Sequence, residues 1–522
     1  MVFRVEGLRR SFVPAIIGLA VIASPAPARA GETLQNLVAA KADYGVRNFY
    51  RQRDYRPLWF VDGRPGTAAR RMIAIFRNAG ADGTTIDPSR IELLERAVAS
   101  AGSGDPSNVA RAEFMLSSAW IDHVRAMSRD VDVGMTYIDA SLRPAAPFPA
   151  AILTAAATAP SLTDHLDANA ALNPLYDRMR DGLLRWRSQW AGLPQVTVPA
   201  GPVLKSGAEG PRVRALRARL GLPAGDLFDQ TTARTVSAFR VAHGLGDAPT
   251  VDADTLAMLN RDPASVEAQL RLNLDRLRAL PRAGAGKYIV VDAASARLYL
   301  YEDGVVQGSM KVVVGKPGEQ TPMAAGLIRT MVLNPYWNVP PDLIRKRVAA
   351  KVLQQGVGYI RQARFEVLSG WDADARVIDP GTVDWAAVAD GRESIRVRQL
   401  PGADNAMGAM KFLFPNNFGV YLHDTPDKAL FSEADRNLSS GCVRLEDAPR
   451  LAKWLFGTIP SAKSAGPEQS VALARPVPVY LTYLTAGWDR STFALRPDVY
   501  GRDKTAVRAE SASLDRSGTT GN

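Results

Sequence analysis

The chain has very little cysteine and histidine: Cys442 is its only cysteine in 522 residues, and there are four histidines. A single thiol cannot form a disulfide within its own chain, so it is either an intermolecular partner or a reactive group. The one thiol and the four imidazoles are not clustered at the spacing of metal ligands, which argues against a zinc site. The first hypothesis to test is therefore a cysteine nucleophile.

Long hydrophobic runs and basic runs are also missing. No segment approaches the roughly 18 uninterrupted apolar residues that would predict a transmembrane helix. The net charge of +11 is spread along the chain, which gives little support to nucleic-acid binding. Residues 1–30 combine a basic start, a short apolar run and Ala28-Arg29-Ala30, the pattern of a cleavable signal peptide. We therefore expect a soluble exported protein without a membrane span.

Composition and periodicity predict several segments, and hence a multidomain α+β protein. The expected organisation is a signal peptide (1–30), a helical N-terminal domain (31–198), three short amphipathic helices (199–262), a helical linker (263–285), a β-rich domain (286–488) and a polar, disordered tail (489–522). Within the helical domain, the aromatic cluster at 55–60 is interpreted as a core anchor.

Strand signals begin at Lys287. The segments 288–291 and 297–301 are strand-like, and Asp303-Gly304 predicts a hairpin. A further strand is expected over 418–422, ending at His423. Between the early strands and the strand expected over 418–422, residues 341–411 form an insertion that lacks the strand periodicity. This insertion opens with a helical stretch, 343–355, and contains Trp371 and Trp385. Placed just before His423, it is either a lid over a site or a segment that packs on the β core.

His423 precedes Cys442 by nineteen residues, at the expected end of a strand. A thiol attacks carbonyl carbon as thiolate, so it needs a base or a cation beside it. The helix announced by Asp447 begins too far beyond Cys442 for its dipole to help, because that effect fades within a turn. The imidazole is therefore expected to supply most of the activation, and the amides of Gly441 and Cys442 could form an oxyanion hole.

Two neighbouring residues have open roles. Asp424 could orient the imidazole with its carboxylate, although a backbone carbonyl is an equally good candidate. Arg444 could hold a substrate carboxylate, or it could brace its loop by pairing with Glu446 or Asp447.

The sequence around His423 and Cys442 makes the pair a specific functional signal. Residues 410–426, MKFLFPNNFGVYLHDTP, followed by SSGCVR at 439–444, closely resemble the catalytic segment of L,D-transpeptidases of the YkuD type. The likeness extends to 314–317, 320–322, 334–340 and 401–408, and covers roughly residues 286–485. The helical N-terminal region, used as a scaffold, and the inserted lid resemble the larger subgroup of that family. Ser440 stands where many members have a second histidine.

Residues 199–262 resemble a peptidoglycan-binding domain of the three-helix type, with matches that include Gly207, Phe228 and Asp252. Leu227 stands where glycine is usual and Arg240 where glutamine is usual. The alternative interpretation is a small helical bundle with no role in carbohydrate binding.

The resemblance implies an activity and a set of roles. Cys442 would be the nucleophile, His423 the base or ion-pair partner and Gly441 an oxyanion donor through its backbone; substrate-binding candidates are Tyr421, Ser439, Ser440, Arg444 and Trp337. The donor would be a peptidoglycan tetrapeptide stem, joined to an acceptor stem in a 3-3 cross-link through a thioester, with release of D-alanine and without a cofactor or metal.

The family also implies acylation by carbapenems and a periplasmic location at the cell wall. Three alternatives remain: an L,D-carboxypeptidase or endopeptidase, attachment of a protein to peptidoglycan by the same thioester, and, in another class, a non-catalytic wall-binding protein.

Overall fold

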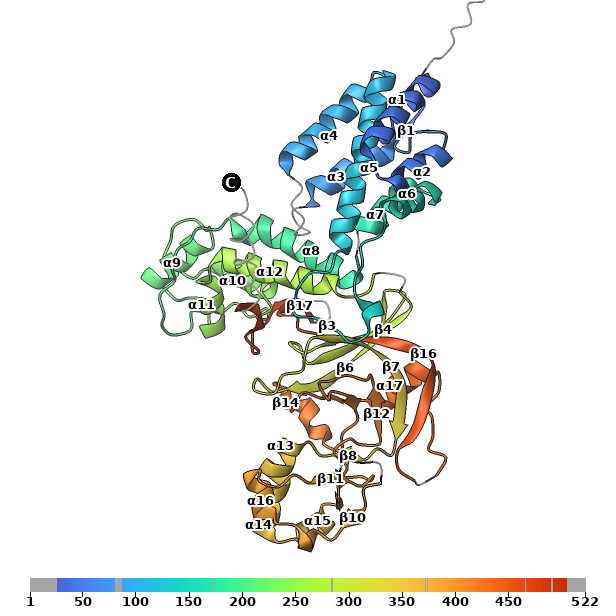
Figure 1. Ribbon diagram of the computed structural model, residues 1–522. Helices are drawn as coiled ribbons and strands as arrows, with labels where there is room; N and C mark the ends of the chain where they lie inside the picture. The colour runs from blue at the N-terminus through green and yellow to red at the C-terminus, as the bar shows by residue number, and fades with distance from the viewer. Residues whose placement is uncertain are drawn as a thin grey trace, which may run out of the picture. The chain divides into compact units, whose positions relative to one another are not determined.

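The structure, a computed structural model, describes residues 26–79, 87–170, 172–282, 285–370, 372, 374–464, 466–489 and 492–504. They belong to two compact units, one formed by Met1–Arg77, Asp87–Asp122 and Phe148–Leu166, the other by Asn78–Ile86, His123–Pro147 and Asp167–Asn522 (Figure 1). Residues 1–25 of the expected signal peptide and Trp371 lie outside the described residues. None of the described helices combines the length and apolarity needed to cross a membrane.

The first unit is helical, as expected. Its elements are α1 (Ala26–Lys41), α2 (Tyr44–Gln52), β1 (Phe60–Val61), β2 (Arg64–Pro65), α3 (Thr67–Arg77), α4 (Pro88–Ala101), most of α5 (Pro106–Ser128), α6 (Pro149–Thr158) and the start of α7 (Leu162–Ala170). Trp59 and Phe60 of the aromatic cluster are buried, which confirms the core-anchor interpretation.

Glu113 on α5 holds this aromatic cluster. Its carboxylate accepts the backbone N–H groups of Leu58 and Trp59 at 2.8 and 2.9 Å and the Tyr50 hydroxyl at 2.8 Å. The side chain is fully buried, and burial raises the pKa of Glu113 to about 6. A buried carboxylate is tolerated here because three donors satisfy it.

Glu113→Ala is expected to lower the free energy of unfolding of the first unit by about 3 kcal/mol, because two buried donors and one part-buried donor lose their acceptor. Native-state hydrogen exchange of the amides in α2 and α5 measures this. The control is Glu92→Ala on α4, whose carboxylate is 67% exposed and pairs only with Arg96; it should change stability by less than about 0.5 kcal/mol. Equal effects of the two substitutions would contradict the anchoring role.

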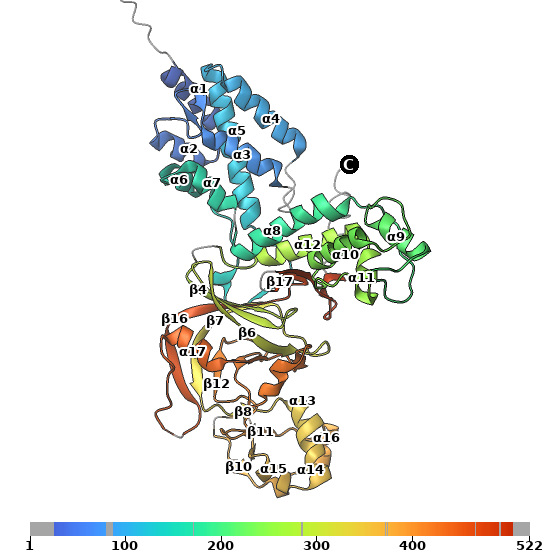
Figure 2. The same ribbon diagram turned by 180° about the vertical axis from the view of Figure 1, so that it is seen from behind.

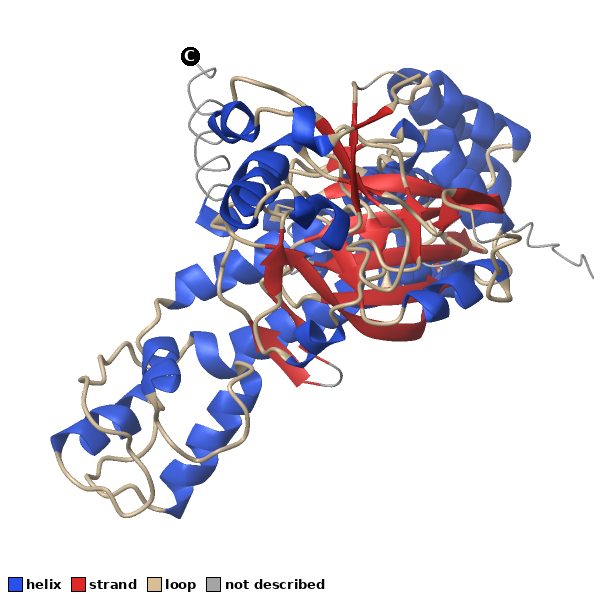
Figure 3. Ribbon diagram, turned by 90° about the horizontal axis from the view of Figure 1, so that it is seen from below, coloured by secondary structure: helices blue, strands red, loops and turns tan. Residues whose placement is uncertain are grey.

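The second unit is built on a sheet that closes on itself. The strand order is β12-β13-β15-β6-β5-β4-β16-β7-β3, and β12 also pairs with β7. The strands, red in Figure 3, are β3 (Thr136–Tyr137), β4 (Lys287–Asp292), β5 (Arg297–Glu302), β6 (Val305–Gly315), β7 (Ala324–Leu333), β12 (Met410–Leu413), β13 (Leu422–His423), β15 (Val443–Leu445) and β16 (Gln469–Thr482), with β14 (Asn437–Ser439) added beside β6. Asp303 and Gly304 both have positive φ and join β5 to β6, which confirms the predicted hairpin.

Helices cover this sheet, so several strands are buried on both faces. Along β4, Ile289 and Val291 enter one core, to which α17 (Ala448–Phe456) contributes Leu451. Tyr288 and Val290 enter a second core with α8 (Pro174–Trp186) and α12 (Pro263–Arg278) (Figure 2). This double burial explains the continuous apolar run in the sequence. It also places α8 in the second unit, before the domain boundary expected at 198.

Three short helices follow α8 and η3 (Arg187–Ala191): α9 (Pro211–Arg219), α10 (Gln230–Ala242) and α11 (Ala253–Leu259). They share a small core of their own, as the sequence predicted. Leu227 is 44% exposed, whereas Arg240 is buried and donates to Asp252, the N-cap of α11, at 2.7 Å. The unusual arginine therefore braces the bundle from inside.

The insertion contains a sheet as well as helices, so the expectation of a helical insertion is incomplete. Its strands are β8 (Trp337–Asn338), β9 (Phe365–Leu368), β10 (Val377–Ile378) and β11 (Arg396–Gln399), in the order β10-β9-β11-β8. The helical turns are α13 (Pro341–Leu343), η4 (Ile344–Ala349), α14 (Ala350–Gln355), α15 (Gly358–Gln362), η5 (Pro380–Thr382) and α16 (Trp385–Asp390). A separate apolar core holds these elements together, which favours an independent subdomain.

Two further expectations were wrong. The strand expected over 418–422 is only β13, because the Asn416 amide bonds the backbone of Phe414, Phe418 and Val420 and closes a turn instead. Within the expected disordered tail, 492–504 are structured: β17 (Ala486–Asp489) pairs with β18 (Thr492–Leu495), and Tyr500 is buried. Residues 505–522 lie outside the described residues.

Candidate active site

The sheet register gathers the predicted site on one face of β12, β13 and β15. His423 pairs with Lys411 on one side and with Arg444 on the other. Residues paired across strands project to the same face, and alternate residues along a strand do so too. The intervening residues, Phe412, Leu422 and Val443, face the apolar core. These strands therefore present a core face and a polar face, and sequence reasoning missed Lys411 on the latter.

The His423 imidazole is buried and oriented by its own backbone neighbour. Its Nδ1 lies 2.6 Å from the Asp424 carbonyl oxygen. Because a carbonyl can only accept, Nδ1 carries the proton and Nε2 keeps its lone pair in the neutral ring. The Asp424 carboxylate instead accepts the Ala409 N–H and the Lys428 ammonium. Of the two orienting groups considered from the sequence, the structure selects the backbone carbonyl.

The electrostatics favour a neutral imidazole. Burial lowers the pKa of His423 to about 4, and the positive charge of Arg444 adds to the shift. Burial also raises the pKa of the Cys442 thiol, although a backbone hydrogen bond at Tyr421 and the charge of Arg444 partly oppose this. At neutral pH the resting pair is therefore a thiol and a neutral imidazole, not a thiolate and an imidazolium.

Cys442 directly precedes β15, so alternation places it on the same face as Arg444 and His423. Its Sγ lies 3.6 Å from the Gly419 carbonyl oxygen. Gly441 has φ 106°, a conformation that glycine adopts far more readily than other residues. The thiol therefore sits at the end of a tight turn, partly open to solvent.

Two hydroxyl groups close that turn. Ser439 Oγ donates to the Cys442 carbonyl at 2.6 Å and accepts the Gly441 N–H at 3.2 Å. Thr321 Oγ1, buried beneath, donates to the Gly441 carbonyl at 2.8 Å. The Gly441 N–H is therefore already engaged, whereas the Cys442 N–H has no acceptor among the described residues. The geometry favours the Cys442 amide as the oxyanion donor.

Arg444 does not brace its loop as one hypothesis had it. Glu446 accepts the Lys311 N–H, and Asp447 caps α17. Within the part of the chain that is described, no carboxylate forms an ion pair with Arg444. Arg444 is partly exposed beside Cys442, so its guanidinium could hold a carboxylate.

The remaining candidates lie at different distances from this centre. Tyr421 is close, because its carbonyl accepts the N–H of Val443, the residue after Cys442, at 2.9 Å. Ser440 is exposed, and its side chain, together with Lys316, lowers the pKa of the nearby Glu319. Trp337 belongs to the insertion, where its ring centre is 6.2 Å from that of Phe365. Ser439 and Tyr421 thus adjoin the turn that carries Cys442, while Trp337 packs with the insertion core.

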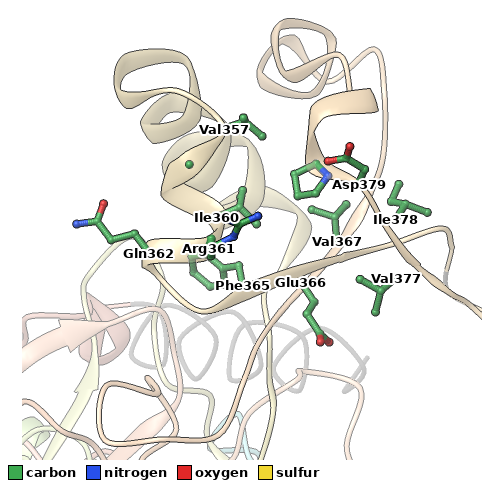
Figure 4. Close-up of a pocket in the computed structure, with 12 residues that line it drawn as sticks. Val357, Ile360, Arg361, Gln362, Phe365, Glu366, Val367, Val377, Ile378 and Asp379 are labelled. Carbon is green, nitrogen blue, oxygen red and sulfur yellow. The ribbon is translucent and has the colours of Figure 1, made fainter.

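The insertion has a cavity of its own, of about 680 Å³, between α15, β9 and β10 (Figure 4). Its lining is mixed, with apolar side chains such as Ile360 and charged ones such as Arg361 and Asp379. None of the predicted site residues contributes to it. In the described part of the chain, no three His, Cys, Asp or Glu side chains are grouped to hold a metal ion.

A closed sheet that carries a cysteine and a buried histidine on one face of neighbouring strands is an arrangement suited to acyl transfer. Residues 286–479 match the family of the L,D-transpeptidase catalytic domain, YkuD, and residues 45–183 match the family of its scaffold domain. Over these two segments the chain is therefore similar to the catalytic domain of YkuD-type L,D-transpeptidases and to a scaffold domain.

A relative from Haemophilus influenzae, provisionally named an L,D-transpeptidase, is 34% identical over 254 residues, which are 47% of this chain and 50% of the relative. The chain thus spans about half the length of that relative. Among solved structures, the L,D-transpeptidase from Mycobacterium smegmatis is 15% identical, over 39% of this chain and 63% of that chain, with a TM-score of 0.20. The L,D-transpeptidase LdtMt1 in complex with imipenem is 15% identical, over 38% and 59%, with a TM-score of 0.19. The likeness to L,D-transpeptidases rests on the domain matches and on the relative.

Proposed function

We propose that this protein is a periplasmic L,D-transpeptidase that forms 3-3 peptidoglycan cross-links through a thioester on Cys442. The observation that carries this proposal is the His423 imidazole, which is fixed through Nδ1 and belongs to the face of β13 and β15 to which strand alternation assigns Cys442. The likeness of residues 286–479 to the L,D-transpeptidase catalytic domain supports the proposed substrate class, a peptidoglycan tetrapeptide stem.

Acylation begins when Nε2 of His423 accepts the thiol proton as the sulfur attacks the carbonyl of the third residue of the stem. The oxyanion that forms is stabilised by the Cys442 N–H. The intermediate collapses when the imidazolium returns its proton to the departing nitrogen, which releases D-alanine and leaves the thioester. A resting neutral pair suits this sequence, because the proton moves only as the sulfur–carbon bond forms.

In the second half of the reaction, an amine of a neighbouring stem attacks the carbonyl carbon of the thioester. His423 accepts the proton of that amine and returns it to the sulfur as the amide forms. Arg444 is proposed to hold a carboxylate of a bound stem, since no protein carboxylate pairs with it among the described residues. Tyr421, Ser439 and Ser440 border the same turn.

Other parts of the proposal follow from the family. Residues 1–30 would direct export and be removed, and the α9–α11 bundle would hold the enzyme on peptidoglycan. A carbapenem would acylate Cys442 through the same attack on a carbonyl. Water in place of the amine would give a carboxypeptidase or endopeptidase, and the amine of a protein would give attachment of that protein to the wall.

Products distinguish these outcomes. We expect the mature protein, incubated with purified tetrapeptide muropeptides, to give a dimer with the mass of two stems minus one D-alanine. Mass spectrometry reads both this dimer and free tripeptide in one sample. Tripeptide without dimer would replace transfer by hydrolysis, and unchanged tetrapeptide would remove the proposed activity altogether.

A further inference from the structure

The segment 496–504, which follows β18, lies against the loop 315–321. We call these segments the C-terminal clamp and the β6 loop. The Tyr500 hydroxyl donates to the Gly315 carbonyl, and the Gln320 amide donates to the Tyr500 carbonyl at 2.9 Å. Arg502 donates to the Gln320 side chain at 3.0 Å and to the Thr321 carbonyl at 2.8 Å. Four hydrogen bonds thus join the clamp to the β6 loop.

The β6 loop in turn supports the turn that carries Cys442. Thr321 Oγ1 accepts the Gly315 N–H at 2.9 Å and donates to the Gly441 carbonyl at 2.8 Å. The loop is tightly closed at Gly315, where a Cβ would lie 2.1 Å from the Glu319 carbonyl oxygen. The two hydrogen bonds of Thr321 therefore link the position of the β6 loop to that of Gly441, the residue before Cys442.

The clamp is itself anchored away from the site. The Asp503 carboxylate pairs with Arg276 of α12 at 2.8 Å and accepts the Thr485 hydroxyl at 2.7 Å. The Tyr500 N–H donates to the Tyr483 hydroxyl at 2.9 Å, and the two rings stack at 4.9 Å. Arg276 and Tyr500 are both buried. The C-terminal clamp is therefore held by α12 and by the residues that directly follow β16, all of which belong to the second unit.

We propose that Tyr500 and Arg502 are positioning residues for the acylation step. They hold the β6 loop, and through Thr321 they fix the Gly441 carbonyl and hence the direction of the Cys442 thiol and N–H. Neither residue contacts the reacting atoms. This inference rests on the proposed function, and it adds the C-terminal segment to the machinery that sets the geometry of attack.

Positioning has a large effect on rate, because a displacement of about 1 Å can cost a factor of 10². Arg502→Ala is therefore expected to slow acylation of Cys442 by a tetrapeptide stem by about tenfold to hundredfold, with little change in the KM for the stem. Arg502→Lys keeps a cationic donor and should recover part of the rate. Tyr500→Phe removes only the bond to Gly315 and should cause a smaller loss in the same direction.

The test compares two reactions of the only thiol in the full-length protein. Acylation by the stem requires a fixed angle of attack, whereas alkylation by iodoacetamide requires only an accessible thiol. In Arg502→Ala, acylation should fall while the alkylation rate stays at the wild-type value. The control is Arg329→Ala on β7, whose side chain is half exposed and pairs with Asp139; both rates should be unchanged there. Equal loss of both rates in Arg502→Ala, or no loss of acylation, would overturn the proposal.

Hydrogen exchange keeps this test separate from the proposed function. In Arg502→Ala, the peptides that cover Gly315 and Gly441 should exchange about tenfold faster, because amide exchange reports local opening. Unchanged exchange would overturn the clamp even if the enzyme is active. Wild-type protein that is not acylated by the stem would refute the proposed function, and the exchange result would still decide whether the clamp holds the turn.

Discussion

Cys442→Ala is expected to abolish both dimer and tripeptide formation, with a fall in turnover of about 10⁴-fold or more. The proposed thioester needs this sulfur, and the chain has no second cysteine to replace it. The measurement is product formation from tetrapeptide muropeptides, together with the mass shift of the acylated protein. Cys442→Ser should fail similarly, because its hydroxyl is much less acidic than a thiol and the neutral imidazole is a weak base.

The fold should survive this change, since the side chain is partly exposed and its hydrogen bond to the Gly419 carbonyl is long, at 3.6 Å. Far-ultraviolet circular dichroism and binding to isolated sacculi serve as controls. Ser432→Ala, at an exposed position in the turn after β13, should retain wild-type turnover. Substantial cross-linking by Cys442→Ala would show that the nucleophile is a different residue.

The acid limb of the pH profile for acylation is expected near pH 4, well below the ordinary histidine value of 6.5. His423 acts as a base only when its ring is neutral. Since burial and the charge of Arg444 lower its pKa to about 4, the active form persists until the pH falls through that value. Below it, the rate should drop tenfold per pH unit. Stopped-flow acylation between pH 3 and pH 8 measures the limb.

Two variants make this prediction specific. His423→Ala should lose about 10²-fold to 10⁴-fold in rate, as expected for removal of a general base, and the limb should disappear. Arg444→Gln removes a neighbouring positive charge, so the pKa of His423 should rise and the limb should move to higher pH. His165→Ala, in the first unit, should leave the profile unchanged. A wild-type limb at pH 6.5 would contradict the buried, neutral imidazole.

Much of the architecture could be predicted because its signals are local. The Asp303-Gly304 turn announced the β5–β6 hairpin, Asp447 announced the start of α17, and the apolar run at 288–291 announced a buried strand. In each case a few adjacent residues determine the backbone conformation, so neighbours in the chain suffice.

The errors arose where distant partners decide. Strand β3, for example, joined the sheet from a segment that was read as part of a helical domain. The polar residues after 489 showed no apolar rhythm, yet Arg502 and Asp503 are held by partners more than 180 residues earlier in the chain. Periodicity cannot reveal hydrogen bonds of that range.

The sequence by itself determined the candidate chemistry: one cysteine, a glycine before it that permits the turn, and a histidine at the end of a strand, within motifs that resemble one enzyme family. Only the tertiary structure decided how these groups are used. It aligned His423 with Arg444 across two strands, placed the Thr321 hydroxyl on the Gly441 carbonyl, and buried the imidazole so that its pKa falls to about 4. The physical reason is that register, burial and charge at this site are set by contacts between segments far apart in the chain, whereas the residues themselves set only what each group can do.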